Sequence, residues 1–248
     1  MFLNITIPVF NEEAQLADSV ARVRACLGRE GMIDCELVIA DNGSTDRTFE
    51  IARSLCRRFA ELRAVHLDAK GRGRALKRVW LESRADILCY MDVDLSTDLA
   101  ALPGLIEAVA CGGYDLAVGS RLLPDSRTTR GWKREIISRC YARLTRAMLG
   151  TQFSDAQCGF KAIRREAAQS LLPLVKDNGW FFDTELLVLA ERLGYRIMDV
   201  PVRWVDDPDS RVNILSTAWE DIKGLRRLRR SIANQKKVEP RIANDAAT

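Results

Sequence analysis

Residues 89–98 read CYMDVDLSTD and place acidic side chains directly after an apolar strand. Side chains two positions apart on an extended chain point to one side, so Asp92 and Asp94 bring two like charges together. A hard divalent ion with oxygen ligands, Mg²⁺ or Mn²⁺, would relieve that repulsion. The alternative is that these are turn acids, with Asp98 favoured at the start of the next helix. The stretch alone leaves both interpretations open.

Apolar runs of strand length alternate with helix-length periodic segments on both sides of this stretch. This order predicts an α/β fold with one mixed, mostly parallel sheet flanked by helices and a Rossmann-like nucleotide-binding half. Ligands are expected beyond the carboxyl ends of its strands. Strands are expected at 3–9, 36–40, 63–67, 86–91 and 115–119, and helices at 13–27, 45–59, 72–83 and 98–110. A further helix is expected near 133–149 and a strand over 195–205.

Polar motifs follow several of the expected strands. In ADNGSTD (40–46), Asp41 is expected to face the ligand edge, where a carboxylate suits a hydroxyl or base N–H of a nucleoside. KGRGRALK (70–77) opens a helix, and its backbone amides, with Lys70 and Arg72 beside them, could hold a diphosphate. A glycine-rich turn with no ligand explains the second motif equally well, because the third glycine of a dinucleotide fingerprint is missing.

The composition of the 248-residue chain is that of an ordinary globular protein, with 47% hydrophobic and 29% charged residues. Seven cysteines include no C-x-x-C pair, which favours a reduced, cytosolic setting. The single histidine, His66, argues against a zinc site or a Ser-His-Asp triad and is expected at a strand end. No apolar run is long enough to predict a spanning helix, and the N-terminus reads as a first strand instead of a signal peptide.

Positive charge is concentrated in two segments of the chain. Residues 121–146 hold eight Lys or Arg and two acids, and 222–237 hold seven and no acid. Anionic partners are expected there, although a solvated basic helix face is an open alternative, and no nucleic-acid motif accompanies the charge. The second segment predicts an amphipathic helix for an anionic membrane surface, with a core-packed or dimer-forming helix equally open. Its apolar positions are Leu215, Ala218, Trp219, Ile222, Leu225 and Leu228.

The combination of motifs is far more specific than any one of them. IPVFNEE, DNGSTD and CYMDVD together resemble the family 2 glycosyltransferases of the GT-A fold. Stretches 119–139, 154–168, 180–187 and 200–213 are similar to the dolichyl-phosphate β-glucosyltransferases and related polyprenyl-phosphate sugar synthases. The resemblance covers about residues 3–215, predicting a catalytic domain over 1–215 and a basic amphipathic helix with a loose tail over 216–248.

The resemblance implies a set of donor-binding residues. The metal, Mg²⁺ or Mn²⁺, would be coordinated by Asp94, with Asp92 on the nucleotide-sugar side. The nucleoside would be held by Pro8, Asn11, Glu13 and Asp41, the diphosphate would lie near Lys70 and Gly71, and the sugar pocket would be lined by Asp155, Gln157 and the stretch Asp183–Glu185. The acceptor phosphate and the donor diphosphate would be surrounded by Arg121, Arg134 and Arg211.

The implied reaction is an inverting displacement that moves a hexose, expected to be glucose, from a UDP-linked donor to a polyprenyl or dolichyl phosphate. The enzyme would lie peripherally on the cytoplasmic membrane face. Alternatives are a mannosyl donor, an alcohol acceptor with Asp183 or Glu185 as base, or a nucleotide-binding module without transfer. Three departures leave sugar and acceptor open: Asn42 replaces a frequent second Asp, Arg211 stands at a Lys position, and the transmembrane anchors common in relatives are not expected here. The oligomeric state is open.

Overall fold

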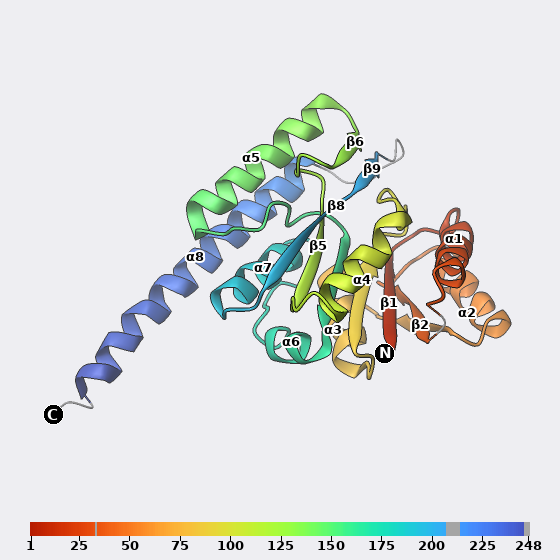
Figure 1. The fold of residues 1–248 in the computed structure, drawn as a ribbon, viewed down its shortest axis with the longest axis horizontal. Helices are drawn as coiled ribbons and strands as arrows, with labels where there is room; N and C mark the ends of the chain where they lie inside the picture. The colour runs from red at the N-terminus through yellow and green to blue at the C-terminus, as the bar shows by residue number, and fades with distance from the viewer. Residues whose placement is uncertain (33, 207–213, 246–248) are drawn as a thin grey trace.

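The structure is a computed structural model that describes residues 1–32, 34–206 and 214–245 (Figure 1). Its centre is a seven-stranded sheet in the order β3-β2-β1-β4-β7-β5-β8. These strands are β1 Leu3–Val9, β2 Cys35–Asp41, β3 Leu62–His66, β4 Ile87–Met91, β5 Leu116–Ser120, β7 Phe160–Arg164 and β8 Ile197–Pro201. A two-stranded sheet joins β6 Arg127–Thr129 to β9 Arg203–Val205.

The sheet is mixed and mostly parallel, as the sequence predicted. Strand β7 is the exception, since it lies antiparallel to both β4 and β5. Its register pairs Phe160 with Met91, and the backbone N–H of Asp92 continues the ladder to the carbonyl of Gly159 at 3.1 Å. The acidic stretch after β4 (residues 92–98) and the QCGF stretch that leads into β7 (residues 157–160) therefore meet at one edge of the sheet.

Helices cover both faces of the sheet, and each face has its own core. The first core packs α1, α2 and α4 on the sheet through side chains such as Leu16, Leu55 and Leu105. The second packs α3, α6, α7 and α8 through residues that include Leu76, Leu186 and Leu225. The helices are α1 Leu16–Arg29, α2 Thr48–Arg58, α3 Arg72–Glu82, α4 Leu102–Ala110, α5 Trp132–Leu149, α6 Arg165–Leu171, α7 Phe182–Arg192 and α8 Ile214–Asp245.

Helices α5 and α8 lie side by side at the edge of the molecule, and the end of α8 extends away from it (Figure 1). On α8, Leu225 and Leu228 are buried in the second core, whereas Trp219 is 54% exposed. Core packing is thus confirmed for part of the predicted apolar stripe. The side chains of Leu215 and Ala218 lie outside the described residues. No helix in the described part of the chain is long and apolar enough to cross a bilayer.

The prediction of one strand over 195–205 was wrong. Pro201 ends β8, and the chain then continues as β9 in the small sheet beside β6. Proline has no N–H to donate to a neighbouring strand, so the strand ends there. β8 and β9 are therefore separate strands, although their residues look like one continuous run in the sequence. Strand β7 was not predicted at all, because its FKAIR run leads without a turn signal into α6. The helix expected from residue 98 begins as a 3₁₀ turn, Leu99–Ala101, before α4.

Candidate active site

The loops after β1 and β2 are fastened to each other at the carboxyl edge of the sheet. Asn11 has a left-handed backbone (φ 56°), and its side-chain Oδ1 accepts from the Thr45 N–H at 2.8 Å. The exposed Glu13 accepts from the Arg47 N–H at 3.0 Å. Pro8 lies buried within β1. The structure thus brings three of the predicted nucleoside-binding residues to one edge, with Asn11 and Glu13 holding the second loop.

Asp41 ends β2 and is fully buried under this edge. One of its oxygens is 2.5 Å from Nδ1 of His66, and the other accepts from the Ser44 N–H at 3.3 Å. His66 is the last residue of β3, as predicted, and its ring lies 4.7 Å from that of Phe49. The Asp41 carboxylate is therefore less accessible to a ligand than the sequence suggested. Its hydrogen-bonding partner His66 was not predicted from the sequence.

The KGRG turn places Lys70 and Gly71 at the start of α3. Lys70 is exposed, with Nζ 4.0 Å above the ring of Phe10. Gly71 has φ +156°, and a Cβ at this position would lie 2.5 Å from the carbonyl oxygen of Asn178. Only glycine allows the loop around Asn178 to lie this close to the turn.

A buried ionic network lies beneath the acidic stretch. The Arg72 guanidinium binds Asp92 at 3.1 Å and Asp183 at 2.5 Å, and so joins two predicted site residues. Asp183 also binds Lys161 Nζ at 3.0 Å and accepts a hydrogen bond from the Tyr90 hydroxyl. The side chains of Arg72, Lys161 and Asp183 are at most 10% exposed. Two cations thus lie between two carboxylates, of which Asp183 is buried and Asp92 is 29% exposed.

This environment shifts the pKa values of the Asp92 and Asp183 carboxyl groups in opposite directions. Burial raises the pKa of Asp92 to about 6, the negative charge of Asp94 adds to the rise, and Arg72 opposes it. Burial would also raise the pKa of Asp183, but the charges of Lys161 and Arg72 outweigh it and hold that pKa below its usual value. Asp183 is therefore a weak base, committed to its three partners.

Asp94 and Asp98 have different local roles. Asp94 accepts from the Ser96 N–H at 2.9 Å. Asp98 accepts from the Ala100 N–H at 2.9 Å and caps the 3₁₀ turn, so its assignment to the start of the next helix is confirmed. Within the described residues, no three His, Cys, Asp or Glu side chains gather as a metal site. An all-oxygen pair such as Asp92 and Asp94 fits a hard cation whose other ligands are diphosphate and water.

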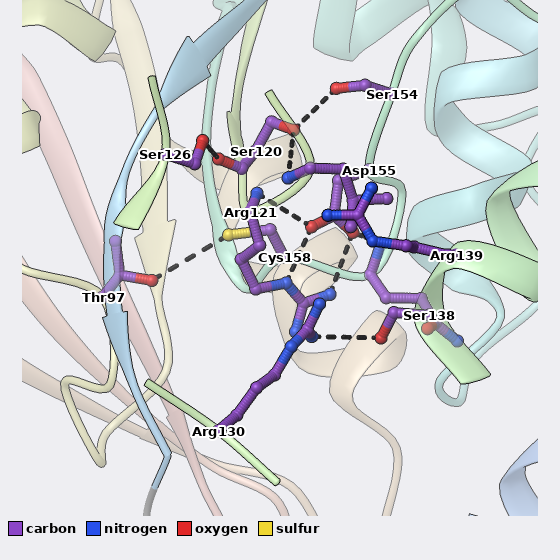
Figure 2. Close-up of polar contacts among 12 residues, drawn as sticks. Thr97, Ser120, Arg121, Ser126, Arg130, Ser138, Arg139, Ser154, Asp155 and Cys158 are labelled. Atoms are coloured by element: carbon purple, nitrogen blue, oxygen red, sulfur yellow. Dashed lines mark hydrogen bonds and ion pairs between the residues drawn. The ribbon is translucent and has the colours of Figure 1, made fainter. Parts of the chain in front are cut away.

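Arg121 and Asp155 form a second ion pair of the site (Figure 2). The Arg121 guanidinium makes a two-pronged ion pair with Asp155 at 2.7 and 2.9 Å, and its backbone N–H adds a third bond at 3.1 Å. Burial acts to raise the pKa of Asp155, yet Arg121 holds it below its usual value. This pair fastens the end of β5 to the SDAQCGF stretch.

Two further arginines of the basic segment 121–146 form ion pairs of their own. Arg130, whose side chain is only 3% exposed, pairs with Glu135 and donates to the Ser138 hydroxyl at 3.1 Å (Figure 2). Arg134 pairs with Asp206. Arg211 lies outside the described residues. Arg130 was not singled out from the sequence, although it belongs to the basic segment that was.

Two predicted sugar-pocket residues contact α8. Gln157 donates from Nε2 to Asp221 at 2.8 Å, and the buried Glu185 pairs with Arg227 at 2.7 Å. Glu185 also accepts from the backbone N–H of Asp177 at 2.8 Å. Asp221 and Arg227 had no signal of their own in the sequence, since charged residues fill most of that segment.

Gly159 provides a test of how tightly Asp92 must be placed. A Cβ at this position would lie 1.8 Å from Asp92 Oδ2, so Gly159→Ala is expected to displace the carboxylate. A displacement of about 1 Å can lower turnover about 100-fold, and a loss of that order is expected here. Steady-state assays of the purified variant measure the loss of turnover.

The matched control is Gly104→Ala in α4, where an added Cβ meets nothing within 4 Å. This variant should keep its activity. Equal turnover in Gly159→Ala and Gly104→Ala would show that the position of Asp92 is unimportant.

The sheet order and its flanking helices define the fold class, GT-A. The family model for glycosyl transferase family 2 matches residues 4–172, and the chain belongs to that family. It shares 39% identity over 225 residues with glycosyltransferase AglD of Haloferax volcanii, covering 90% of this chain and 35% of that protein. The chain thus spans about a third of the length of this relative.

Other relatives are similar over most of their length. Dolichyl-phosphate beta-glucosyltransferase of Dictyostelium discoideum is 27% identical, covering 92% of this chain and 74% of that protein. Undecaprenyl-phosphate mannosyltransferase of Micrococcus luteus is 30% identical, with 81% and 82% covered. A crystal structure of glucosyl-3-phosphoglycerate synthase from Mycobacterium tuberculosis, in complex with Mn²⁺, UDP and phosphoglyceric acid, superposes with a TM-score of 0.67 at 24% identity, covering 92% of this chain and 78% of that one.

Proposed function

We propose that the protein transfers a hexose, glucose in the first instance, with inversion from a UDP-linked donor to a polyprenyl or dolichyl phosphate. The observation that supports this most is the pairing of β7 with both β4 and β5, which brings Asp92 to the same edge of the sheet as the Arg121–Asp155 pair. A donor diphosphate with its cation and an anionic acceptor need these two opposite charge environments close together.

On the donor side, the proposed roles follow the sequence assignments. Asn11, Glu13 and Asp41 with Pro8 hold the nucleoside, and Lys70 with the amides near Gly71 holds the diphosphate. Asp94, aided by Asp92, binds Mg²⁺ or Mn²⁺, which supplies positive charge to the departing diphosphate. Asp155 and Gln157 line the sugar pocket.

On the acceptor side, Arg121 and Arg134, with Arg211, are proposed to orient the phosphate for in-line attack on the anomeric carbon. A phosphate monoester is mostly dianionic near neutral pH, its second pKa being about 6, so it needs no strong base. An alcohol acceptor would need one. Asp183 and Glu185 are buried in ion pairs, and the lowered pKa of Asp183 makes it a poor proton acceptor. This favours the phosphate over the alcohol.

The names of the relatives support the same acceptor class. Two are described as acting on dolichyl phosphate or undecaprenyl phosphate, one with glucose and the other with mannose. Mannose is therefore the alternative sugar. The test is to incubate the protein with polyprenyl phosphate, Mg²⁺ and either UDP-glucose or GDP-mannose carrying a labelled sugar, and to extract the lipid. Label from UDP-glucose alone supports the proposal, and lipid label from neither donor refutes it.

The acceptor assignment has its own variant, Arg134→Ala. Its partner Asp206 is half-buried, and the pair lies at the surface, so the fold should tolerate the change. A loss of about 10-fold or more in turnover with the lipid phosphate is expected from removing one charged contact. Unchanged turnover would remove Arg134 from the acceptor site.

We also propose that the protein lies peripherally on the cytoplasmic membrane face through α5 and α8. The outer surface of α5 carries exposed apolar side chains among basic ones, and Trp219 of α8 is exposed beside Lys223. A groove of about 550 Å³ between these helices is lined by apolar residues and arginines. Apolar and basic side chains on one surface suit an interface of anionic lipids. The exposed apolar residues of α5 are Trp132, Ile136, Ile137 and Leu144.

Vesicle flotation tests this surface. The double variant Trp132→Ser with Ile136→Ser should bind vesicles of phosphatidylcholine and phosphatidylglycerol at least about 10-fold more weakly, because each lost apolar contact is worth about 1–2 kcal/mol. Leu193→Ser removes an apolar side chain that is 55% exposed outside α5 and α8, and should bind like the unmodified protein. Equal flotation of all three proteins would refute the membrane surface.

A further inference from the structure

Helix α8 places a buried carboxyl group against the proposed sugar pocket. Asp221 is 3% exposed and accepts a hydrogen bond from Gln157 Nε2 at 2.8 Å. We propose that Asp221 is a positioning residue, which sets which end of the Gln157 side-chain amide faces the donor sugar. This inference rests on the proposed function, because it takes Gln157 as part of the sugar pocket.

The backbone around Gln157 is already fixed without Asp221. The Gln157 N–H donates to Asp155 Oδ1 at 3.1 Å, and Asp155 is itself held by the two-pronged ion pair with Arg121. What remains to be set is the direction of the Gln157 amide group. Its one side-chain partner among the hydrogen bonds of the described residues is Asp221, on a helix more than sixty residues later in the chain.

Helix α8 holds Asp221 firmly in place. Leu225 and Leu228, one and two turns further along, are buried in the second core. Gly224 lies against Phe181, and a Cβ there would come within 2.4 Å of the phenyl ring. The missing side chain of Gly224 thus lets α8 pack closely on Phe181, and this packing with Leu225 and Leu228 fixes the position of Asp221.

The protonation state of Asp221 biases the direction of the Gln157 side-chain amide. An ionised carboxylate only accepts hydrogen bonds, so it holds Gln157 by Nε2 and leaves Oε1 for the sugar. A protonated carboxyl can donate to Oε1, which would turn Nε2 toward the sugar instead. The pocket then offers a hydroxyl group an acceptor in one state and a donor in the other.

The surroundings of Asp221 place this change near neutral pH. Burial raises its pKa to about 7, opposed by the bond from Gln157 and the charge of Arg72. The negative charges of Asp177 and Glu220 act with burial. From α5, Tyr141 is a further titratable neighbour, and its own pKa is raised by burial. Arg72 is the first residue of α3, and Asp177 lies in the loop before α7. Tyr141 is on α5, and Glu220 is on α8 beside Asp221.

The decisive measurement is the side-chain amide signal of Gln157 in ¹H–¹⁵N spectra, assigned by its loss in Gln157→Leu. We expect its shift to titrate with a midpoint near pH 7. In Asp221→Asn, which keeps the shape but does not ionise, the shift should be constant from pH 6 to 8. Glu220→Gln removes an exposed carboxylate one residue away, and should retain the titration.

Kinetics give a second and separate readout. The KM for the nucleotide sugar should change across pH 7 in the unmodified protein and in Glu220→Gln, but not in Asp221→Asn. A constant amide shift in the unmodified protein, or a titration that survives in Asp221→Asn, would overturn the inference. The amide measurement needs no turnover, so a failure of the proposed reaction would appear as missing lipid product with the titration still present.

Discussion

Replacing Asp94 by Asn is expected to reduce sugar transfer by at least about 100-fold, the loss that follows when one preorganised stabiliser of transition-state charge is removed. Asn keeps the size of the side chain and can keep the hydrogen bond from the Ser96 N–H, so the local turn should survive. What it removes is the negative charge proposed to bind Mg²⁺ or Mn²⁺. Initial rates across a range of Mg²⁺ concentrations measure the loss and any shift in metal requirement.

Asp98→Asn is the matched control for this variant. Asp98 belongs to the same acidic stretch but is exposed and caps the 3₁₀ turn, a role that Asn fills about as well. Its activity should stay within about 2-fold of that of the unmodified protein, given the near-equal capping energies. If Asp94→Asn retained full, chelator-resistant activity, the metal assignment would be wrong.

The largest expected effect on stability comes from Lys161→Met. Lys161 is 3% exposed and lies 3.0 Å from Asp183, in the network that also contains Arg72. Breaking a buried ion pair by removing one partner costs about 3–5 kcal/mol, because a buried charge is left undercompensated. Urea denaturation at pH 7, followed by circular dichroism, measures the lost free energy of unfolding.

The effect of Lys161→Met should depend on pH in a definite direction. The pKa of Asp183 is held below its unfolded value, so its contribution to stability is present above the unfolded pKa and is lost as pH falls through the folded pKa. The variant should therefore be closest to the unmodified protein in acid and furthest from it at pH 7. Lys176→Met, at an exposed lysine, should change stability by less than about 0.5 kcal/mol. Equal stabilities of both variants at pH 7 would contradict the network.

Most of the sheet could be predicted because each parallel strand carries its own signal. Strands β1 to β5 appear as apolar runs separated by helical periodicity, and the structure places them within one or two residues of the predicted bounds. Strand β7 could not be predicted in the same way. Its neighbours, β4 and β5, come earlier in the chain, so its pairing and antiparallel direction depend on contacts over long sequence distances.

The same reasoning explains which site residues the sequence revealed. Acidic residues at strand ends, such as Asp92 and Asp94, are unexpected in an apolar setting and attract notice. Arg72 and Lys161 lie within quoted motifs, but nothing local shows that both reach Asp183. Asp221 gives even less signal, because its segment is full of charged residues. Only the packing of α8 in the folded protein brings this one carboxyl group to Gln157.

The central position of β7 has a consequence for how the chain folds. The pairing of Met91 with Phe160 closes a loop that contains β5, β6 and α5, and β5 can join the sheet only through β7. Contacts between residues so distant in sequence are slow to form. During synthesis, the first four strands would wait with an unpaired edge at β4 until β7 leaves the ribosome. We expect that edge to be where chaperones bind the nascent chain and where truncated chains aggregate.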